Sequence, residues 1–310
     1  MKKLYINCFK FILIVLLSAI LLDGLSMVGS FRRFFSRLTN SREFVGGGPD
    51  EIRPYIEKAG TPDGTTKVIL GDSVCRQLFN DLQKYNDDVS IIGSNAAITM
   101  AGQYILAKEY LDNHPDATDV FLIVLPQALG RTYDTHHGYP YAVMPFVETD
   151  TLRYLEDSTI GIISETYGDF FLNSTVVRSL DLSAVNRKLY LNHLARSGPG
   201  YNMTDYYELA DIYIPKINEM CESAGVNFYL YPCPVCESQL SEIERIREGF
   251  DESALTVINS DYMDMIWYYP AEQSADDVHF SVDYADREHL NEVIKESFGD
   301  KEIYDIIRLE

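Results

Sequence analysis

Five short runs of apolar and β-branched residues recur after the N-terminal part of the chain, and they alternate with longer stretches of helical periodicity. Such short runs are typical of strands that are buried on both faces of a sheet. Strands that alternate with helices predict an α/β fold with a doubly wound, mostly parallel sheet. The expected strands are 67–70, 89–92, 120–125, 226–231 and 255–258, and the expected helices are 73–84, 100–113, 206–224, 237–250 and 286–298.

Two clusters of breaker residues precede this regular pattern. The sequence reads GGGP at 46–49 and TPDG at 61–64, and both clusters are typical of a linker. The segment after the third strand run lacks strand patterning and is interpreted as a mostly helical insertion over the carboxyl edge of the sheet. The expected organisation is an N-terminal segment, a linker and a folded domain that contains the insertion: 1–42, 43–66, 67–310 and 130–204.

The N-terminal segment has the pattern of an export signal. An uncharged run, FILIVLLSAILL at 11–22, follows Lys2, Lys3 and Lys10. The apolar character continues to Phe31, and a helix over these 21 residues would be about 31 Å long, enough to cross a bilayer. We expect an uncleaved signal anchor that forms one transmembrane helix, and the alternative is a cleaved export signal. Basic residues flank the run on both sides, so charge does not orient it.

The charge of the chain is strongly asymmetric. It has 26 basic and 47 acidic residues, a formal net charge of -21. Seven of the basic and one of the acidic residues lie in 1–42, which leaves 19 basic and 46 acidic residues, or -27, for the remainder. Duplex binding needs several Lys or Arg contacts to phosphates, so the charge argues against a nucleic-acid partner. It also favours a neutral or ester-masked polymer over a strongly anionic one.

The first expected strand ends in a candidate catalytic turn. The sequence VILGDS at 68–73 is a buried strand that ends at Gly71 and leads into a helix near Ser73. Open α/β sheets bind ligands at the carboxyl ends of their strands, and a helix start provides a free backbone N–H for an oxyanion. Ser73 is therefore a candidate nucleophile. The alternative is that Ser73 only caps the helix, which serine often does.

A second candidate motif lies just before the last expected helix. In DDVHF at 276–280, Asp276 precedes His279 by three residues. On a loop, this spacing lets the carboxylate accept a hydrogen bond from one ring nitrogen while the other ring nitrogen faces a nucleophile. Together with Ser73, the two residues have the composition of a catalytic triad.

These two motifs, ILGDSVCRQL and DDVHFS, resemble the first and last conserved blocks of the SGNH or GDSL-like hydrolases. The resemblance spans about 67–298. It implies a three-layer α/β/α sandwich of the flavodoxin-like type, with Ser73 as nucleophile, His279 as general base and Asp276 as the acid that orients it. It implies an acyl-serine intermediate and requires no metal or other cofactor.

Two blocks depart from the family pattern. Members of the family complete the oxyanion hole with a glycine N–H from a second block and an asparagine side chain from a third. The second block here is IIGSNAA at 91–97, which offers Gly93 and Asn95, and Ala97 stands where glycine is common. The third block lacks the Gly-x-Asn-Asp motif, and Gln127 is the amide that can take its place. Loss of one oxyanion donor can lower the rate about 100-fold or more.

The anchor and the hydrolase motifs together resemble the accessory proteins of membrane-bound O-acyltransferases. That likeness implies a single-pass protein of the cell membrane with its domain on the extracytoplasmic side. The expected activity is that of a serine esterase or O-acyltransferase on acyl esters of a cell-surface or secreted polysaccharide. The expected partners are the acylated glycan or another ester, the membrane and a membrane-bound O-acyltransferase. The alternative is a weak or inactive glycan-binding partner of that enzyme, because the third block is missing.

Other residue groups have weaker functional interpretations. Cys233 and Cys236 have CxxC spacing, but no second pair completes a zinc site, so a local disulfide or inert thiols are favoured over redox chemistry. Asp134, His136 and His137 could ligate a metal, although such loop residues more often lie on the surface. The aromatic stretch 266–270 could stack on a sugar ring or simply pack in the core.

Overall fold

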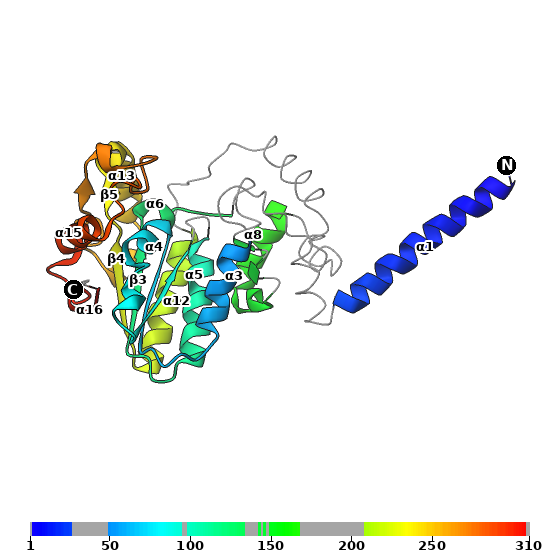
Figure 1. The fold of residues 1–310 in the computed structure, drawn as a ribbon, viewed down its shortest axis with the longest axis horizontal. Coiled ribbons are helices and arrows are strands. Elements are labelled where there is room, and N and C mark those ends of the chain that lie inside the picture. Colours follow the sequence, from blue (N-terminus) through cyan, green and yellow to red (C-terminus); the bar gives the residue numbers. More distant parts are fainter. Residues whose placement is uncertain are drawn as a thin grey trace.

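The centre of the fold is a four-stranded parallel sheet with the strand order β2-β1-β3-β4. In this computed structural model, residues 2–26, 49–94, 98–133, 142–143, 145–146, 149–167 and 208–307 are described. The strands are β1 (Lys67–Gly71), β2 (Val89–Gly93), β3 (Asp119–Val124) and β4 (Asn227–Pro232). Because all four strands run in the same direction, their carboxyl ends lie along one edge of the sheet (Figure 1).

Helices cover both faces of this sheet, as the buried strand runs predict (Figure 1). On one side, α5 packs against both α3 and α12. On the other side, α4 contacts the sheet, and its Phe79 ring lies 5.9 Å from the Phe298 ring of α15. The arrangement is an α/β fold with a parallel sheet and is consistent with a three-layer sandwich. The helices are α3 (Pro49–Ala59), α4 (Ser73–Phe79), α5 (Met100–Asn113), α12 (Glu208–Ala224), α13 (Leu240–Phe250) and α15 (Arg287–Phe298).

Four of the five expected strands are confirmed, but the prediction of a strand at 255–258 is wrong. These residues form a short helix, α14 (Leu255–Ile258), in which Leu255 is buried and Val257 is 87% exposed. The Ser253 hydroxyl accepts a hydrogen bond from the Leu255 N–H and starts the helical turn. A four-residue apolar run fits a helix turn as well as a strand, so local chemistry at Ser253 determined the outcome.

Part of the expected linker, 43–66, belongs to the folded unit. Helix α3 (Pro49–Ala59) packs against α5 and β2, and its Ile52, Ile56 and Ala59 side chains are buried in the core. The Lys58 ammonium donates a hydrogen bond of 2.9 Å to the Ile91 carbonyl of β2. The GGGP cluster therefore stands immediately before a core helix, with its proline as the first helical residue.

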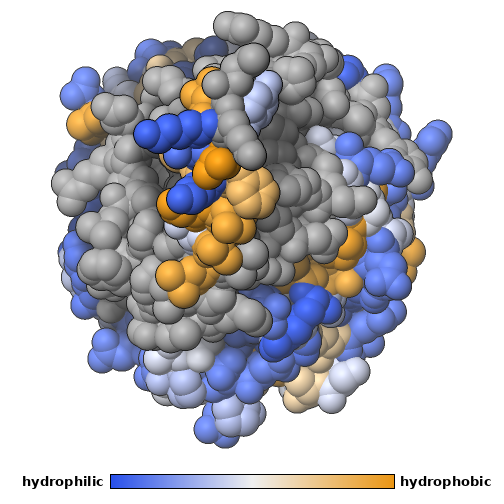
Figure 2. All heavy atoms as spheres, turned by 90° about the vertical axis from the view of Figure 1, so that its right-hand side faces the viewer, coloured by the Kyte–Doolittle hydropathy of each residue, from blue (hydrophilic) through white to orange (hydrophobic). Residues whose placement is uncertain are grey.

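The N-terminal segment contains helix α1 (Lys2–Ser26), which is drawn apart from the folded body in Figure 1. Its large apolar side chains are exposed, including Leu4, Phe9 and Phe11 at 66–68%. Figure 2, viewed from this end, shows a group of apolar side chains facing outward. Within the described residues, no helix is both long and apolar enough to cross a bilayer, so the expected transmembrane helix is not confirmed.

The expected insertion at 130–204 lies largely outside the described residues. Its described part includes η3 (Thr151–Tyr154) and α8 (Asp157–Tyr167), which are helical as expected. The Tyr213 hydroxyl of α12 donates a hydrogen bond of 2.7 Å to Thr159 and accepts one from the Glu156 N–H. This part of the insertion is therefore fastened to α12.

Candidate active site

The turn between β1 and α4 lies very close to β3 and to the first turn of α4. Gly71 is the last residue of β1, and a Cβ atom there would overlap the Ile123 carbonyl oxygen of β3 and lie 2.5 Å from the Cys75 Sγ. Only glycine fits at this position without displacing the backbone. The Gly71 carbonyl accepts hydrogen bonds from the Gln103 side chain and the Ser94 N–H, each 3.0 Å long. The strand end that presents Ser73 is therefore held on both sides.

Asp72, not Ser73, is the N-cap of α4, so the capping alternative for Ser73 is wrong. One Asp72 oxygen accepts hydrogen bonds from the Val74 and Cys75 N–H groups, and the other accepts one of 2.6 Å from the Leu125 N–H. The Cys233 thiol also donates to this carboxylate, at 3.6 Å. Burial raises the pKa of Asp72, while these hydrogen bonds act in the opposite direction. The carboxylate joins the turn that carries Ser73 to the ends of β3 and β4.

Ser73, His279 and Asp276 form a continuous chain of hydrogen bonds. The Ser73 Oγ lies 2.7 Å from the His279 Nε2, although 206 residues separate them in sequence. On the other side of the ring, the His279 Nδ1 lies 2.8 Å from one Asp276 oxygen and 3.1 Å from the other. If Nδ1 donates its hydrogen to Asp276, Nε2 is left as the acceptor for the Ser73 hydroxyl. The structure thus brings together the three residues predicted from the two motifs.

Backbone hydrogen bonds fix the loop that carries His279 and Asp276. Asp276 Oδ1 accepts from the Val278 and His279 N–H groups, and Asp277 between them takes a left-handed conformation with φ of 66°. Partial burial raises the pKa of Asp276, but the backbone and ring hydrogen bonds from His279 outweigh it and leave the pKa below its usual value. Asp276 is therefore held as a carboxylate, the form that accepts the His279 hydrogen.

The site is partly open to solvent. Ser73 is 5% exposed, whereas the side chains of His279 and Asp276 are 34% and 57% exposed. The hydroxyl thus lies at the base of the site, and the imidazole is reachable from outside. A serine hydroxyl paired in this way with an imidazole and a carboxylate is an activated nucleophile.

Comparison with protein-family models, curated proteins and solved structures finds no match to this chain. The resemblance to SGNH hydrolases therefore stays a prediction that rests on the two sequence motifs. The hydrogen bonds that link Ser73, His279 and Asp276 are a separate observation, because they depend on the tertiary structure and not on the resemblance of either motif to a family.

Two of the three expected oxyanion residues lie at the same carboxyl edge of the sheet. Gly93 ends β2, and a Cβ atom there would lie 2.9 Å from the Arg76 Cα of α4, so its lack of a side chain allows close packing. Gln127 lies on α6 (Pro126–Leu129), two residues after Leu125, whose N–H binds Asp72. The Gln127 Oε1 is buried and has no hydrogen-bond partner within the described part of the chain. Asn95 lies outside the described residues.

The sequence favoured either a local disulfide or inert thiols for the CxxC pair, and the structure shows no disulfide there. Cys233 and Cys236 are buried free thiols; the first donates to Asp72, and the second accepts a hydrogen bond from the Ser238 hydroxyl. Burial is the main cause of a Cys233 pKa well above its usual value, so this thiol is protonated and poorly nucleophilic. Across the described ranges, no group of three His, Cys, Asp or Glu residues could hold a metal ion. Asp134, His136 and His137 lie outside those ranges.

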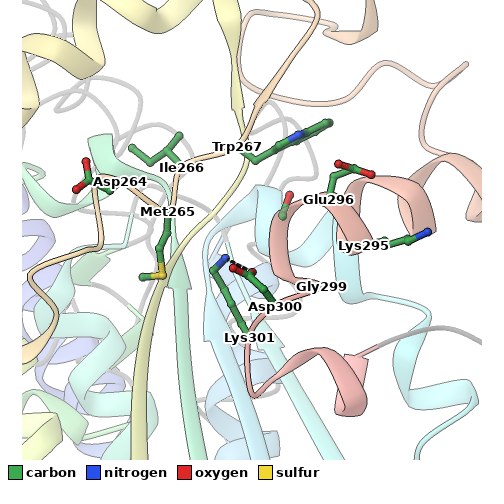
Figure 3. A pocket seen from close by; sticks show the side chains of 10 residues that line it. Asp264, Met265, Ile266, Trp267, Lys295, Glu296, Gly299, Asp300 and Lys301 are labelled. Atoms are coloured by element: carbon green, nitrogen blue, oxygen red, sulfur yellow. Dashed lines mark hydrogen bonds and ion pairs between the residues drawn. The ribbon is translucent and has the colours of Figure 1, made fainter.

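The aromatic stretch before the His279 loop is mainly structural. Tyr269 is fully buried, its ring lies 4.4 Å from that of Phe280, and its hydroxyl donates to the Val278 carbonyl. Trp267 instead lines an open pocket beside the end of α15, together with Lys295 and Lys301 (Figure 3). None of the three triad residues lines this pocket.

Sequence reasoning missed two residues that hold the site together. Asp72 stands directly before Ser73, and the available signal was that Asp is as strong an N-cap as Ser. Gln77 was not singled out, and its amide binds the backbone of Phe280. Its position four residues after Ser73 was the available signal, since residues i and i+4 share one helix face.

Proposed function

We propose that this protein is a serine esterase or O-acyltransferase that works through an acyl-serine intermediate. The observation that carries the proposal is the unbroken chain from the Ser73 hydroxyl to the His279 ring and the Asp276 carboxylate, with contacts of 2.7 and 2.8 Å. Hydrogen-bonded groups in this order activate a hydroxyl for attack on a carbonyl carbon. Ser73 is almost buried, which supports a hydroxyl that acts on a bound substrate over one that only contacts surface water.

In the first half of the reaction, the Ser73 Oγ attacks the carbonyl carbon of an ester. The hydroxyl proton moves to the His279 Nε2, and the carbonyl oxygen becomes an oxyanion. When the tetrahedral species collapses, the ester C–O bond breaks, and His279 returns the proton to the departing alcohol. The acyl group is then held as an ester on Ser73.

In the second half, His279 takes a proton from an attacking hydroxyl and then gives it to the Ser73 oxygen as the acyl group leaves. If water attacks, the product is a carboxylic acid and the protein is an esterase. If a sugar hydroxyl attacks, the acyl group is transferred and the protein is an O-acyltransferase. Asp276 holds the ring orientation through both halves and stabilises the imidazolium.

The oxyanion needs donors that face the reacting carbonyl. We assign this role to the Ser73 N–H, which as the first helical residue has no intrahelical acceptor, and to Gly93, Asn95 or Gln127. Gln127 could serve only through its Nε2, because its buried Oε1 is an acceptor and cannot donate to an oxyanion. A second candidate function, a weak or inactive binding partner, is favoured by the absence of Gly-x-Asn-Asp after β3.

The proposed substrate is an acyl ester of a cell-surface or secreted polysaccharide, and the proposed partner is a membrane-bound O-acyltransferase. The charge of -21 favours a neutral or acyl-masked glycan over a strongly anionic polymer. We further propose that the N-terminal segment attaches the protein to the cell membrane, with the domain on the extracytoplasmic side. The support is the exposed apolar surface of α1, together with the basic residues Lys3 and Lys10 within it.

Labelling of the full-length protein with a fluorophosphonate tests the nucleophile. We expect wild type and Ser260→Ala, which alters an exposed serine outside the site, to react at the same rate, and Ser73→Ala not to react. Equal labelling of Ser73→Ala and wild type would exclude Ser73 as the nucleophile.

Hydrolysis of an aryl acetate then separates the two candidate functions. An active enzyme gives turnover that is lost in His279→Ala, because the His279 Nε2 is the group that lies in position to accept the Ser73 proton. A binding partner gives no turnover above that of His279→Ala and would instead bind the acylated glycan. In an active enzyme, added oligosaccharide that carries away the acyl group would identify transfer.

A further inference from the structure

Gln77 connects the helix that carries Ser73 with the loop that carries His279. Its Nε2 donates a hydrogen bond of 3.2 Å to the Phe280 carbonyl, and its Oε1 accepts one of 3.1 Å from the Phe280 N–H. Both polar groups of the amide are therefore used, and both bind the backbone of the residue that follows His279. The two residues are 203 positions apart in sequence.

We infer that Gln77 is a positioning residue that sets the distance between the Ser73 hydroxyl and the His279 ring. This inference rests on the proposed serine-nucleophile function and names a residue that acts on the same site through His279. Gln77 does not contact the reacting atoms itself. It acts by fixing the backbone from which the imidazole projects.

The geometry of α4 supports this role. Ser73 and Gln77 are four residues apart, so their side chains leave the same helix face one turn apart. Ser73 reaches the His279 ring, and Gln77 reaches the backbone one residue further along. The loop is thus held to α4 at two neighbouring points. A loop held at the Ser73–His279 contact alone could rotate about that contact.

The far side of the loop is fixed as well. Phe280 is 2% exposed, its ring packs on Tyr269, and its backbone pairs with Ser274 in an antiparallel bridge. The Ser274 hydroxyl and the Ala275 N–H both donate to the His279 carbonyl. These contacts keep the loop folded, but they all lie within 269–280. Gln77 adds the link from this folded loop to the nucleophile helix.

A small displacement of the imidazole has a large effect on rate. Misplacement of a catalytic group by about 1 Å can lower the rate roughly 100-fold, because proton transfer needs a short, aligned hydrogen bond. We expect loss of the Gln77 bonds to lower kcat about 10- to 100-fold. KM should stay within about twofold, since Gln77 has no assigned contact with the substrate.

The main test compares Gln77→Met with Asn86→Leu in the full-length protein. Methionine has nearly the length of glutamine but forms neither bond. Asn86 is a control outside the site, because its amide also binds two backbone groups: it donates to the Ile306 carbonyl, 220 positions away, and accepts from the nearby Asp88 N–H. We expect both variants to lose some thermal stability and only Gln77→Met to lose kcat. A kcat within twofold of wild type in folded Gln77→Met would overturn the inference.

Two further measurements keep the test decisive. Gln77→Glu replaces only the amide nitrogen, so it keeps the acceptor for the Phe280 N–H. This variant is the one to measure if Gln77→Met does not fold. An unchanged kcat in Gln77→Glu also counts against the inference. Amide hydrogen exchange at Phe280 needs no activity and should speed up at least 10-fold in Gln77→Met but not in Asn86→Leu. If wild type shows no Ser73-dependent turnover, the proposed function fails, and unchanged exchange at Phe280 would separately refute the positioning role.

Discussion

Replacement of Asp72 with alanine removes four hydrogen bonds at once from the turn that carries Ser73. The Val74 and Cys75 N–H groups lose their cap, and the Leu125 N–H and the Cys233 thiol lose their acceptor. Asp72 is 1% exposed, so water cannot replace the carboxylate without entering the core. The turn that carries Ser73 and the ends of β3 and β4 would then be held together only by packing.

The magnitude follows from these bonds. Loss of an N-cap costs about 1 kcal/mol. A buried donor left without a partner costs about 1 to 3 kcal/mol, and the Leu125 N–H becomes such a donor. The variant no longer buries a carboxylate, so it avoids the desolvation that raises the Asp72 pKa, and this gain offsets part of the cost. We therefore expect Asp72→Ala to lower the free energy of unfolding by about 2 to 3 kcal/mol, against a typical total of about 5 to 15 kcal/mol.

Asp286→Ala is the matched control, because the exposed Asp286 side chain caps α15 through the His289 N–H and makes no other hydrogen bond among the described residues. This variant should lose only about 1 kcal/mol. Urea unfolding followed by far-UV circular dichroism measures both, with equal slopes required for the comparison. Equal destabilisation of the two variants would refute the view that Asp72 joins β1, β3 and β4. Asp72→Asn, which keeps one oxygen acceptor, should fall between them and remains measurable if Asp72→Ala does not fold.

Three other predictions concern the same region. Gly71→Ala should lower the free energy of unfolding by about 3 kcal/mol in the same urea assay, because its Cβ would overlap the backbone carbonyl oxygen of Ile123 and the Cys75 side chain. Asp276 has a folded-state pKa below its usual 3.8, so its carboxylate contributes stability that is lost as the pH falls through the folded value. In thermal unfolding, the stability of Asp276→Asn should therefore fall less with decreasing pH than that of wild type. Cys75 and Cys233 should resist a thiol-exchange reagent at pH 8 until the protein is unfolded, as mass spectrometry can show, since burial raises both pKa values.

The elements that could be predicted were those with a long or fully buried pattern. The expected helix at 100–113 is α5 with the same bounds, and the runs that became β1 and β2 were located to within one residue. Short patterns were ambiguous: 255–258 became a helix turn, and the expected helix at 73–84 ends at Phe79 before a separate 3₁₀ turn, η1 (Leu82–Lys84). Local hydrogen bonds decide such cases, and apolar spacing does not report them.

The pairing of Asp276 with His279 could be predicted because three residues of loop keep the two side chains within reach. Ser73 could be proposed as their partner only from its place at the end of a parallel strand, and the motif resemblance implied the same residue. The contribution of Asp72 to the ends of β3 and β4 left no local trace, because Leu125 and Cys233 are distant in sequence.

The amino-acid sequence by itself determined the α/β class, the four core strands, the acidic charge and the three residues of the candidate triad, because each depends on local periodicity, composition or short spacing. The tertiary structure alone decided that Ser73 and His279 meet at 2.7 Å, that α3 joins the core and that Gln77 binds the His279 loop. Those contacts join residues up to 206 positions apart. Their formation depends on how the parallel strands and their helices pack, which no local pattern encodes.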